Sequence, residues 1–354
     1  MTTLLWESGS AYDFFIALYV LHHPQEFGVR PTWAAGMRSR LPAGQRALLE
    51  MAQTFLGVPL PWLHGLPAEA KAAYPALQAL AALPPAQRLK ALLWRGDFTP
   101  AAEQALEHLI ARGEATPEER EVLRETLTRR GRPLRPEAFQ ALLRTAAQAE
   151  AFGSAYLEAL ETFWRVFFCE EEARLRPWLA RGLEEAQALA RRTDLPNLLD
   201  LLSGGVHFEA LEGIPELVLV PSYWSTPLVF YSRVAPERWM LVFGCRPPQQ
   251  SLLPGEDLPE TLLNRLKALA DPTRLHILRY LAQGPQTPTQ LARRLRLRAP
   301  TVVHHLQALR VAGLVQITIT REGERLYALR PEAIRQAHAD LVAFLNVSDT
   351  PSEP

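Results

Sequence analysis

The stretch that decides the fold reads Thr287-Pro-Thr-Gln-Leu-Ala-Arg-Arg-Leu-Arg-Leu-Arg-Ala-Pro-Thr-Val-Val-His-His-Leu-Gln-Ala-Leu309. It contains two helix starts: a capping box of Thr287 with Gln290, and Pro300 at a first helical position. We expect one helix through Leu295, a four-residue turn, and a second helix over 301–311. This arrangement is a helix-turn-helix, whose second helix can lie in the major groove of DNA.

The flanking sequence extends the motif on both sides. Asp271-Pro272 caps a helix over 273–281, in which we expect Leu275, Ile277, Leu278 and Leu281 to line the inner face. After the helix-turn-helix, residues 314–320 alternate as a strand, 321–324 form a turn, and 325–329 return as a second strand. This hairpin is a wing, with Arg321 and Arg325 at the two sides of its tip.

The charge of the chain is distributed unevenly. Residues 260–335 hold thirteen Lys and Arg against five Asp and Glu, a net of +8, which leaves 25 basic and 33 acidic residues elsewhere, a net of −8. Four of the arginines, at 293, 294, 296 and 298, cluster at the turn of the helix-turn-helix. A basic segment this compact indicates contact with a polyanion, although a solvated charged face is the alternative.

The length of 354 residues suits two domains. Residues 12–21, 47–56 and 157–168 show helical apolar spacing, whereas 217–220, 228–231 and 240–243 read as short strands. We therefore expect a mainly α, α+β protein overall: a helical N-terminal domain over 1–245 closed by a small antiparallel sheet, a linker over 246–259, a DNA-binding domain over 260–346, and a disordered tail over 347–354.

Several classes of protein are not indicated. No apolar run is long enough to span a membrane and no signal peptide is visible, so we expect a soluble, cytoplasmic chain without a membrane partner. Two distant cysteines, Cys169 and Cys245, suggest neither a disulfide framework nor a thiolate zinc site. Motifs for phosphate-binding loops, serine hydrolases and zinc proteases are missing, so we expect neither an enzyme nor a cofactor.

The C-terminal quarter resembles the winged-helix domain of ArsR-type bacterial transcriptional regulators. The resemblance rests on residues 266–278, on 304–315, and on the hairpin Arg321-Glu-Gly-Glu-Arg-Leu-Tyr327. It implies binding of double-stranded DNA at an operator through residues 301–310 and the wing. It also implies a homodimer formed by the residues before Asp271 and the helix over 331–346.

The sequence departs from that family at positions that matter. Metal sensors of the family often carry a cysteine pair on the first helix of the motif, where this chain has Thr289-Gln-Leu-Ala-Arg-Arg294. The last helix offers His338 and Asp340 without a second histidine, so we do not expect a metal effector. Arg298 and Val303 replace the serines that are usual in the family; arginine can reach a phosphate or a guanine, and valine a thymine methyl group.

The two adjacent histidines, His304 and His305, point about 100° apart on a helix and cannot share one metal ion. The resemblance places His304 toward DNA and His305 between DNA and the core, whereas the alternative is that both are structural or solvated. The expected DNA-binding residues are Thr289, Gln290, Arg298, Thr301, Val303, His304, His305, Gln307, Arg310, Arg321 and Arg325.

The sequence says less about the role of the N-terminal domain. Its aromatic residues at 6, 14, 15, 19, 156, 163, 164, 167 and 168 line either a ligand cavity or a core, and a stripe at helical spacing is more often core. We expect this domain to support dimerisation or to sense a small-molecule effector. The leading function is a dimeric DNA-binding transcriptional regulator; the alternative is a winged-helix protein-interaction module without specific DNA binding.

Overall fold

The computed structural model of the chain describes residues 2–94, 96, 98–128, 134–211, 213–247, 250–252, 259–320 and 323–345. These residues form two compact units that are discontinuous in sequence. The first comprises 2–25, 29–185 and 213–245, and the second 26–28, 186–211 and 246–345, as far as they are described. The expected tail over 347–354 and two segments of the expected linker, 248–249 and 253–258, lie outside the described residues.

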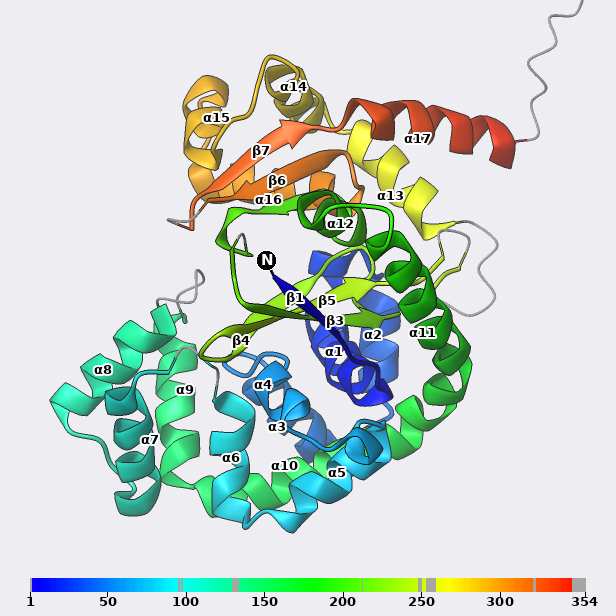
Figure 1. Cartoon of the computed structure of the whole chain (residues 1–354). Helices are drawn as coiled ribbons and strands as arrows, with labels where there is room; N and C mark the ends of the chain where they lie inside the picture. Colours follow the sequence, from blue (N-terminus) through cyan, green and yellow to red (C-terminus); the bar gives the residue numbers. More distant parts are fainter. Residues whose placement is uncertain are drawn as a thin grey trace, which may run out of the picture. The chain divides into compact units, whose positions relative to one another are not determined.

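The first unit is built from helices around one sheet. In Figure 1, helices α5 to α11 form an arc around this sheet. The helices are α1 (Ser10–His22), α2 (Pro31–Arg38), α3 (Ala43–Ala52), α4 (Leu60–His64), α5 (Ala73–Ala82), α6 (Pro85–Leu93), α7 (Pro100–Arg112), α8 (Pro117–Thr128), α9 (Pro136–Ala147), α10 (Ala149–Phe163) and α11 (Cys169–Ala190), the last of which continues α10 through a π-helical turn at Trp164–Phe168. The mainly α, α+β class that the sequence predicts is confirmed.

The sheet of the first unit is mixed, and the predicted all-antiparallel sheet is wrong. Its strands β1 (Thr3–Trp6), β3 (Glu216–Ser222), β4 (Phe230–Ala235) and β5 (Arg238–Gly244) are ordered β1-β3-β5-β4. The β1–β3 and β3–β5 pairs are parallel, and only β4–β5 is an antiparallel hairpin. The unbroken apolar run 217–220 is the reason, because strands buried on both faces are typical of parallel sheets.

The aromatic stripe of the first unit is core. Phe14 is fully buried between Phe15, Phe163 and Phe168, with ring centroids 5.1, 5.4 and 5.3 Å away. Phe167 packs edge-on against Trp224 at 5.7 Å. Rings in contact at these distances fill one another's space, so these positions belong to the core. Trp6, Tyr19 and Trp164 of the same aromatic set are only half-buried.

The second unit contains the helix-turn-helix and its wing. Its elements are α12 (Leu195–Leu202), β2 (Val206–Phe208), α13 (Glu260–Leu269), α14 (Pro272–Leu281), α15 (Pro288–Leu295), α16 (Ala299–Val311), β6 (Val315–Ile319), β7 (Arg325–Leu329) and α17 (Pro331–Phe344). The hairpin β6–β7 is antiparallel as expected. An unexpected third strand, β2, pairs parallel with β6, placing Val206 opposite Ile317.

Strand β2 changes how the chain is divided. The sequence placed every residue up to 245 in the N-terminal domain, whereas residues 186–211 group with the winged helix. Val206 and Phe208 are 3% and 2% exposed, and the backbone N–H of Ile317 donates to the carbonyl of Gly205. This pairing covers one edge of the wing sheet, which would otherwise present free backbone groups.

Candidate nucleic-acid interface

Side-chain caps fix the helix-turn-helix. The carboxylate of Asp271 accepts a hydrogen bond from the backbone N–H of Arg274 at 2.9 Å, which starts α14. Thr287 and Gln290 form the complete capping box at the start of α15. Helix α15 ends at Arg296, whose φ of 56° is left-handed and turns the chain toward α16. The sequence predicted each helix start, although α16 begins two residues earlier than expected.

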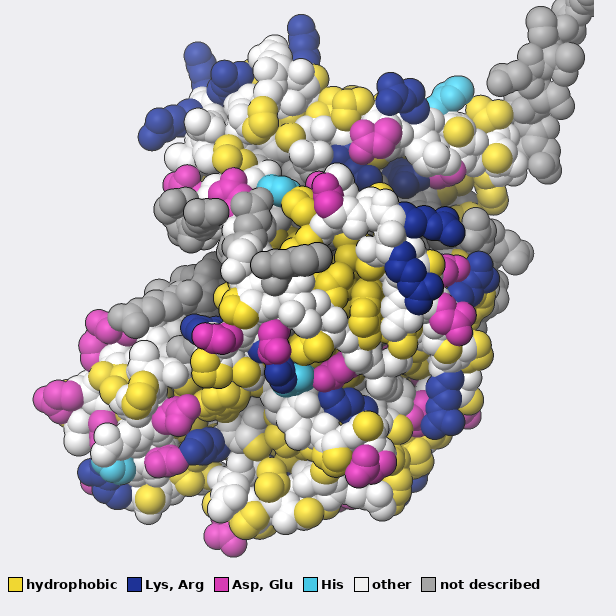
Figure 2. Space-filling model, viewed as in Figure 1, with side chains coloured by type: hydrophobic (Ala, Val, Ile, Leu, Met, Phe, Trp, Pro, Cys, Tyr) yellow, Lys and Arg dark blue, Asp and Glu magenta, His cyan; other side chains and the backbone are white. Residues whose placement is uncertain are grey.

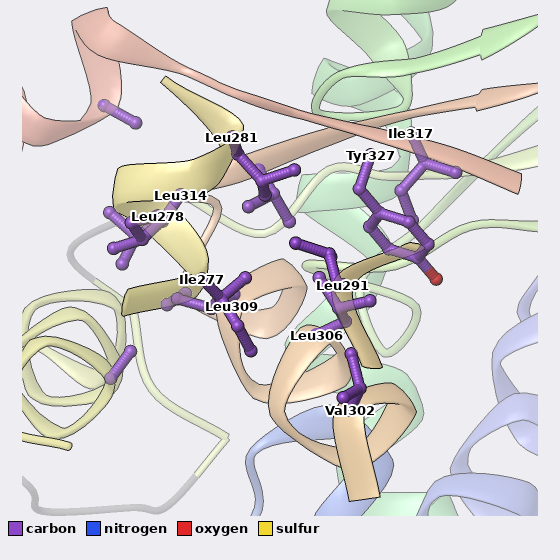
Figure 3. Close-up of a cluster of buried hydrophobic side chains, with 14 of the residues drawn as sticks. Ile277, Leu278, Leu281, Leu291, Val302, Leu306, Leu309, Leu314, Ile317 and Tyr327 are labelled. Atoms are coloured by element: carbon purple, nitrogen blue, oxygen red, sulfur yellow. The ribbon is translucent and has the colours of Figure 1, made fainter. Parts of the chain in front are cut away.

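One face of α16 is held in the core of the unit. Val302, Leu306 and Leu309 are fully buried, and Figure 3 shows them beside Ile277 and Leu291 of α14 and α15. Because these three positions share one side of the helix, the opposite side is directed away from the core.

The predicted inner face of α14 requires one correction. Ile277, Leu278 and Leu281 are buried as expected, but Leu275 is 47% exposed. Leu275 lies two residues, about 200° of helical rotation, before Ile277, so the two side chains cannot face the same core.

The N-terminal half of α16 presents exposed side chains. Thr301, Val303 and His304 are exposed, Val303 to 45% although it is apolar. On the preceding helix Thr289 and Gln290 are also exposed, but the side-chain oxygen of Gln290 accepts from the backbone N–H of Thr287 in the capping box. The side-chain oxygen of Gln290 is therefore already engaged in capping α15.

Arginines surround this surface. Arg293, Arg294, Arg296 and Arg298 are all exposed, and we call these four residues the arginine turn. Figure 2 shows Lys and Arg side chains projecting where α14 and α15 lie. The guanidinium of Arg294 lies 5.4 Å from the ring centroid of Tyr280, a cation–π contact.

The two histidines of α16 differ in environment. His304 is exposed, whereas the side chain of His305 is 16% exposed and its Nδ1 lies 3.8 Å from Oδ1 of Asp271. Burial lowers the pKa of His305 below its usual value, partly opposed by the charge of Asp271. The ring centroids are 6.1 Å apart and the planes are inclined by 65°, so the rings diverge.

The C-terminal half of α16 is less available than the sequence suggested. The amide of Gln307 donates at 2.9 Å to the backbone carbonyl of Glu26, a residue of the same unit. Arg310, one of the expected DNA-binding residues, is half-buried and interacts within the chain. Arg310 lies nine residues after Thr301, about half a turn around the helix, so the two side chains point in opposite directions.

The wing is hydrogen-bonded to the segment between α14 and α15. Tyr327 of β7 is buried, and its backbone exchanges two 2.9 Å hydrogen bonds with Gln286. Gly323, with φ of 82°, lies in the turn, and Arg325 is exposed at the start of β7. Arg321, the other expected wing arginine, lies outside the described residues.

Helices α13 and α17 lie against each other through an ion pair of Arg265 with Asp340, whose other carboxylate oxygen accepts from Gln336 at 2.7 Å. At the end of α17 the apolar side chains of Phe344 and Leu345 are 46% and 56% exposed.

The described part of the chain lacks two kinds of feature. No group of three or more His, Cys, Asp or Glu side chains there is arranged to hold a metal ion. No helix there combines the length and the apolar character needed to cross a membrane.

Comparison with known proteins agrees with this geometry. Residues 271–316, which hold the helix-turn-helix and the first wing residues, match the family described as "Bacterial regulatory protein, arsR family". The chain is also 42% identical over 96 residues to the "HTH-type transcriptional regulator CmtR" of Mycobacterium bovis and of Mycobacterium tuberculosis, a match that covers 27% of this chain and 80% of each relative. Through its winged-helix unit, the chain therefore belongs to the arsR family of bacterial regulatory proteins.

Proposed function

We propose that the chain is a transcriptional regulator that binds operator DNA as a homodimer, through the first half of α16, the arginine turn and the wing. The observation that carries this proposal is the arginine turn itself. Four exposed guanidinium groups flank the exposed start of a helix whose other face is locked into the core. Phosphates supply most of the affinity in such interfaces, and base edges supply the specificity.

The exposed residues divide into two roles. Arg293, Arg294, Arg296 and Arg325 are exposed and positively charged, which suits contact with the phosphate backbone. Thr301, Val303 and His304 project from the first turns of α16, the part of a recognition helix that reads base edges. We assign a thymine methyl group as the partner that suits Val303 best, because the valine is apolar and 45% exposed.

The same proposal assigns dimerisation to α13 and α17. Two-fold symmetry would bring each recognition helix to one half-site, with centres about 34 Å apart along the DNA. The exposed Phe344 and Leu345 supply apolar area that a second copy would cover. An effector would act by changing the dimer geometry, so that both recognition helices no longer fit at once.

We place the effector in the first unit and propose that it is not a metal ion. Helix α15 holds no cysteine, and Asp340 on α17 is already paired with Arg265. A thiolate metal site on α15 therefore has no ligands, and Asp340, a candidate metal ligand on the last helix, is already engaged by an arginine. Both points favour an organic effector.

The experiment is a selection from fragmented genomic DNA of the source organism, using the purified chain at moderate salt and sequencing the bound fragments. Recovery of a few sites with inverted repeats supports the proposal. Recovery of DNA without sequence preference, together with affinity that is insensitive to salt, contradicts it and favours the protein-interaction alternative.

A further inference from the structure

A short segment from the start of the chain belongs to the winged-helix unit. Residues 26–28 group with the second unit, whereas the chain up to Gln25 and from Val29 onward groups with the first. They continue a 3₁₀ turn that begins at Pro24, whose carbonyl accepts from the backbone N–H of Val29 at 2.9 Å. Phe27 is 4% exposed, so the segment is packed into the protein and does not run over its surface.

This segment contacts the second half of the recognition helix α16. The side-chain amide of Gln307 donates to the backbone carbonyl of Glu26 at 2.9 Å. One helical turn later, Cγ1 of Val311 would lie 2.7 Å from a Cβ atom placed on Gly28. Positions four residues apart lie on the same side of a helix, so both contacts fall on one face of α16. Contacts at two consecutive turns restrain both the tilt and the rotation of that end of the helix.

Gly28 contacts a second helix as well. A Cβ atom on it would also lie 2.7 Å from Nδ2 of Asn264 in α13. Gly28 has a φ of 72°, which glycine adopts without strain, and the missing side chain lets its backbone fit between α13 and α16. Asn264 can rotate its amide away from an added Cβ. Val311 cannot yield in the same way, because it is 8% exposed and a valine in a helix has one strongly preferred rotamer.

The face of α16 that is held in this way leads to the exposed start of the helix. Val303, Gln307 and Val311 follow one another at intervals of four residues. Val303 is the exposed side chain to which we assign a thymine methyl group. Val303 and Val311 are separated by roughly 12 Å along the helix, so a tilt of about 10° at the held end moves Val303 by roughly 2 Å. A displacement of that size is larger than a binding contact tolerates.

We propose that residues 26–28 form a clip that positions the recognition helix relative to α13, and that Gln307 and Gly28 are positioning residues for DNA binding. The inference rests on the proposed binding of operator DNA by α16. In a dimer built on α13 and α17, the clip sets the angle at which each recognition helix meets its half-site. The clip is covalently continuous with the first unit at both ends, so a shift of Gln25 or Val29 is passed directly to the contact with α16.

The test is a double-mutant cycle in the affinity of the full chain for a DNA site recovered by the genomic selection. Gln307→Met keeps the length of the side chain and removes the donor; it should raise the dissociation constant at least about fivefold, because both protomers lose the contact. Gly28→Ala should raise it at least about tenfold by displacing the clip. In the Gly28→Ala background, Gln307→Met should add less than about twofold, since the carbonyl of Glu26 has already moved.

Gly313→Ala is the matched control for the strain of a left-handed alanine. Gly313 follows the same helix with a φ of 67°, and no described residue beyond its own neighbours comes within 4 Å of an added Cβ. This variant should therefore change the dissociation constant by less than about twofold. Circular dichroism at the assay temperature checks that each variant is folded.

Base preference gives a second readout, which decides the matter alone if Gly28→Ala does not fold. Replacing a glutamine that reads a base relaxes the preference at a single base pair of each half-site. A positioning residue acts on all the contacts of α16, so Gln307→Met should relax no single base pair selectively.

Losses that multiply in the cycle, or a preference relaxed at one base pair, would show that Gln307 contacts DNA directly and would overturn the inference. Wild-type DNA binding that neither substitution weakens rejects the clip alone. A wild-type chain that binds no DNA rejects the regulator proposal, and the positioning role with it.

Discussion

Asp13 is a fully buried acid at the start of α1, and its replacement by asparagine tests the interior of the first unit. Oδ1 accepts from the hydroxyl of Ser222 at 2.9 Å and from the backbone N–H of Trp224 at 2.8 Å. Oδ2 has no hydrogen-bond partner in the part of the chain that the structure describes. Burial raises the pKa of Asp13 from 3.8 to about 7.

The direction of the pH effect follows from that shift. Between about pH 4 and pH 7 the folded state holds a proton on Asp13 that the unfolded state has lost, so this residue makes stability fall as the pH rises. A shift of about three units, at about 1.4 kcal/mol each, makes the ionised carboxylate cost roughly 4 kcal/mol above pH 7. Asparagine keeps the acceptor at Oδ1 and removes the titration.

We therefore expect the free energy of unfolding of Asp13→Asn, relative to wild type, to rise by roughly 4 kcal/mol from pH 4 to pH 8. The difference is the quantity to follow, because the pKa of His22, lowered to about 4, gives an opposing slope in both proteins. Urea unfolding followed by tryptophan fluorescence isolates the first unit, since all eight tryptophans belong to it.

Glu150→Gln, an exposed acid on α10, is the control and should give a difference that is flat with pH. If the difference for Asp13→Asn is also flat with pH, within about 1 kcal/mol, then Asp13 titrates with an ordinary pKa. That result would contradict the buried position of its carboxylate.

Three more predictions concern the second unit. Leu306→Ala, at a fully buried position, should lower the stability of this unit by about 2–5 kcal/mol and weaken DNA binding. The unfolding transition followed by tryptophan fluorescence should stay as in wild type. A shifted tryptophan transition would mean that the units do not unfold separately. Thr287→Ala should cost about 1 kcal/mol in thermal unfolding followed by circular dichroism, and Thr289→Ala, which removes no cap, almost nothing; equal losses would refute the capping box. Phe344→Ser should raise the dimer dissociation constant by about tenfold or more in analytical ultracentrifugation, because each protomer loses a ring from the proposed interface; an unchanged constant would place the dimer contact elsewhere.

The parts of the fold that local chemistry controls were predictable from the sequence. Asp271 and Thr287 act within three residues of themselves, so their caps could be read directly. The hairpin β6–β7 also followed from alternation and a short turn.

Elements that depend on distant partners were missed. Strand β2 has three residues and pairs with a strand more than 100 residues later, and β1, with four residues, pairs with β3 across nearly all the helices of the first unit. Segments this short carry too little periodicity to be recognised, and only the partner strand stabilises them. The unbroken apolar run 217–220 was a local signal for parallel pairing of β3 that the antiparallel prediction overlooked. The insertion of β5 between β3 and β4 has no local signal.

The candidate interface was predictable where it depends on exposure of the first turns of α16, as at Arg298, Thr301 and His304. The interface was less predictable where tertiary contacts determine which side chains are exposed. Gln307 is engaged by a backbone carbonyl, and Arg310 is half-buried. A helical wheel places Arg310 opposite Thr301, and that signal was available in the sequence.

The most direct test of the central claim is the salt dependence of affinity for a DNA site recovered by the genomic selection, compared between wild type and Arg298→Ala. If Arg298 of each protomer neutralises one phosphate, the slope of log K against log salt should become shallower by about 1.8, with base preference retained. Arg181→Ala, an exposed arginine of the first unit, should keep the wild-type slope. An unchanged slope in Arg298→Ala, or a wild-type affinity that does not depend on salt, would contradict DNA binding through the arginine turn.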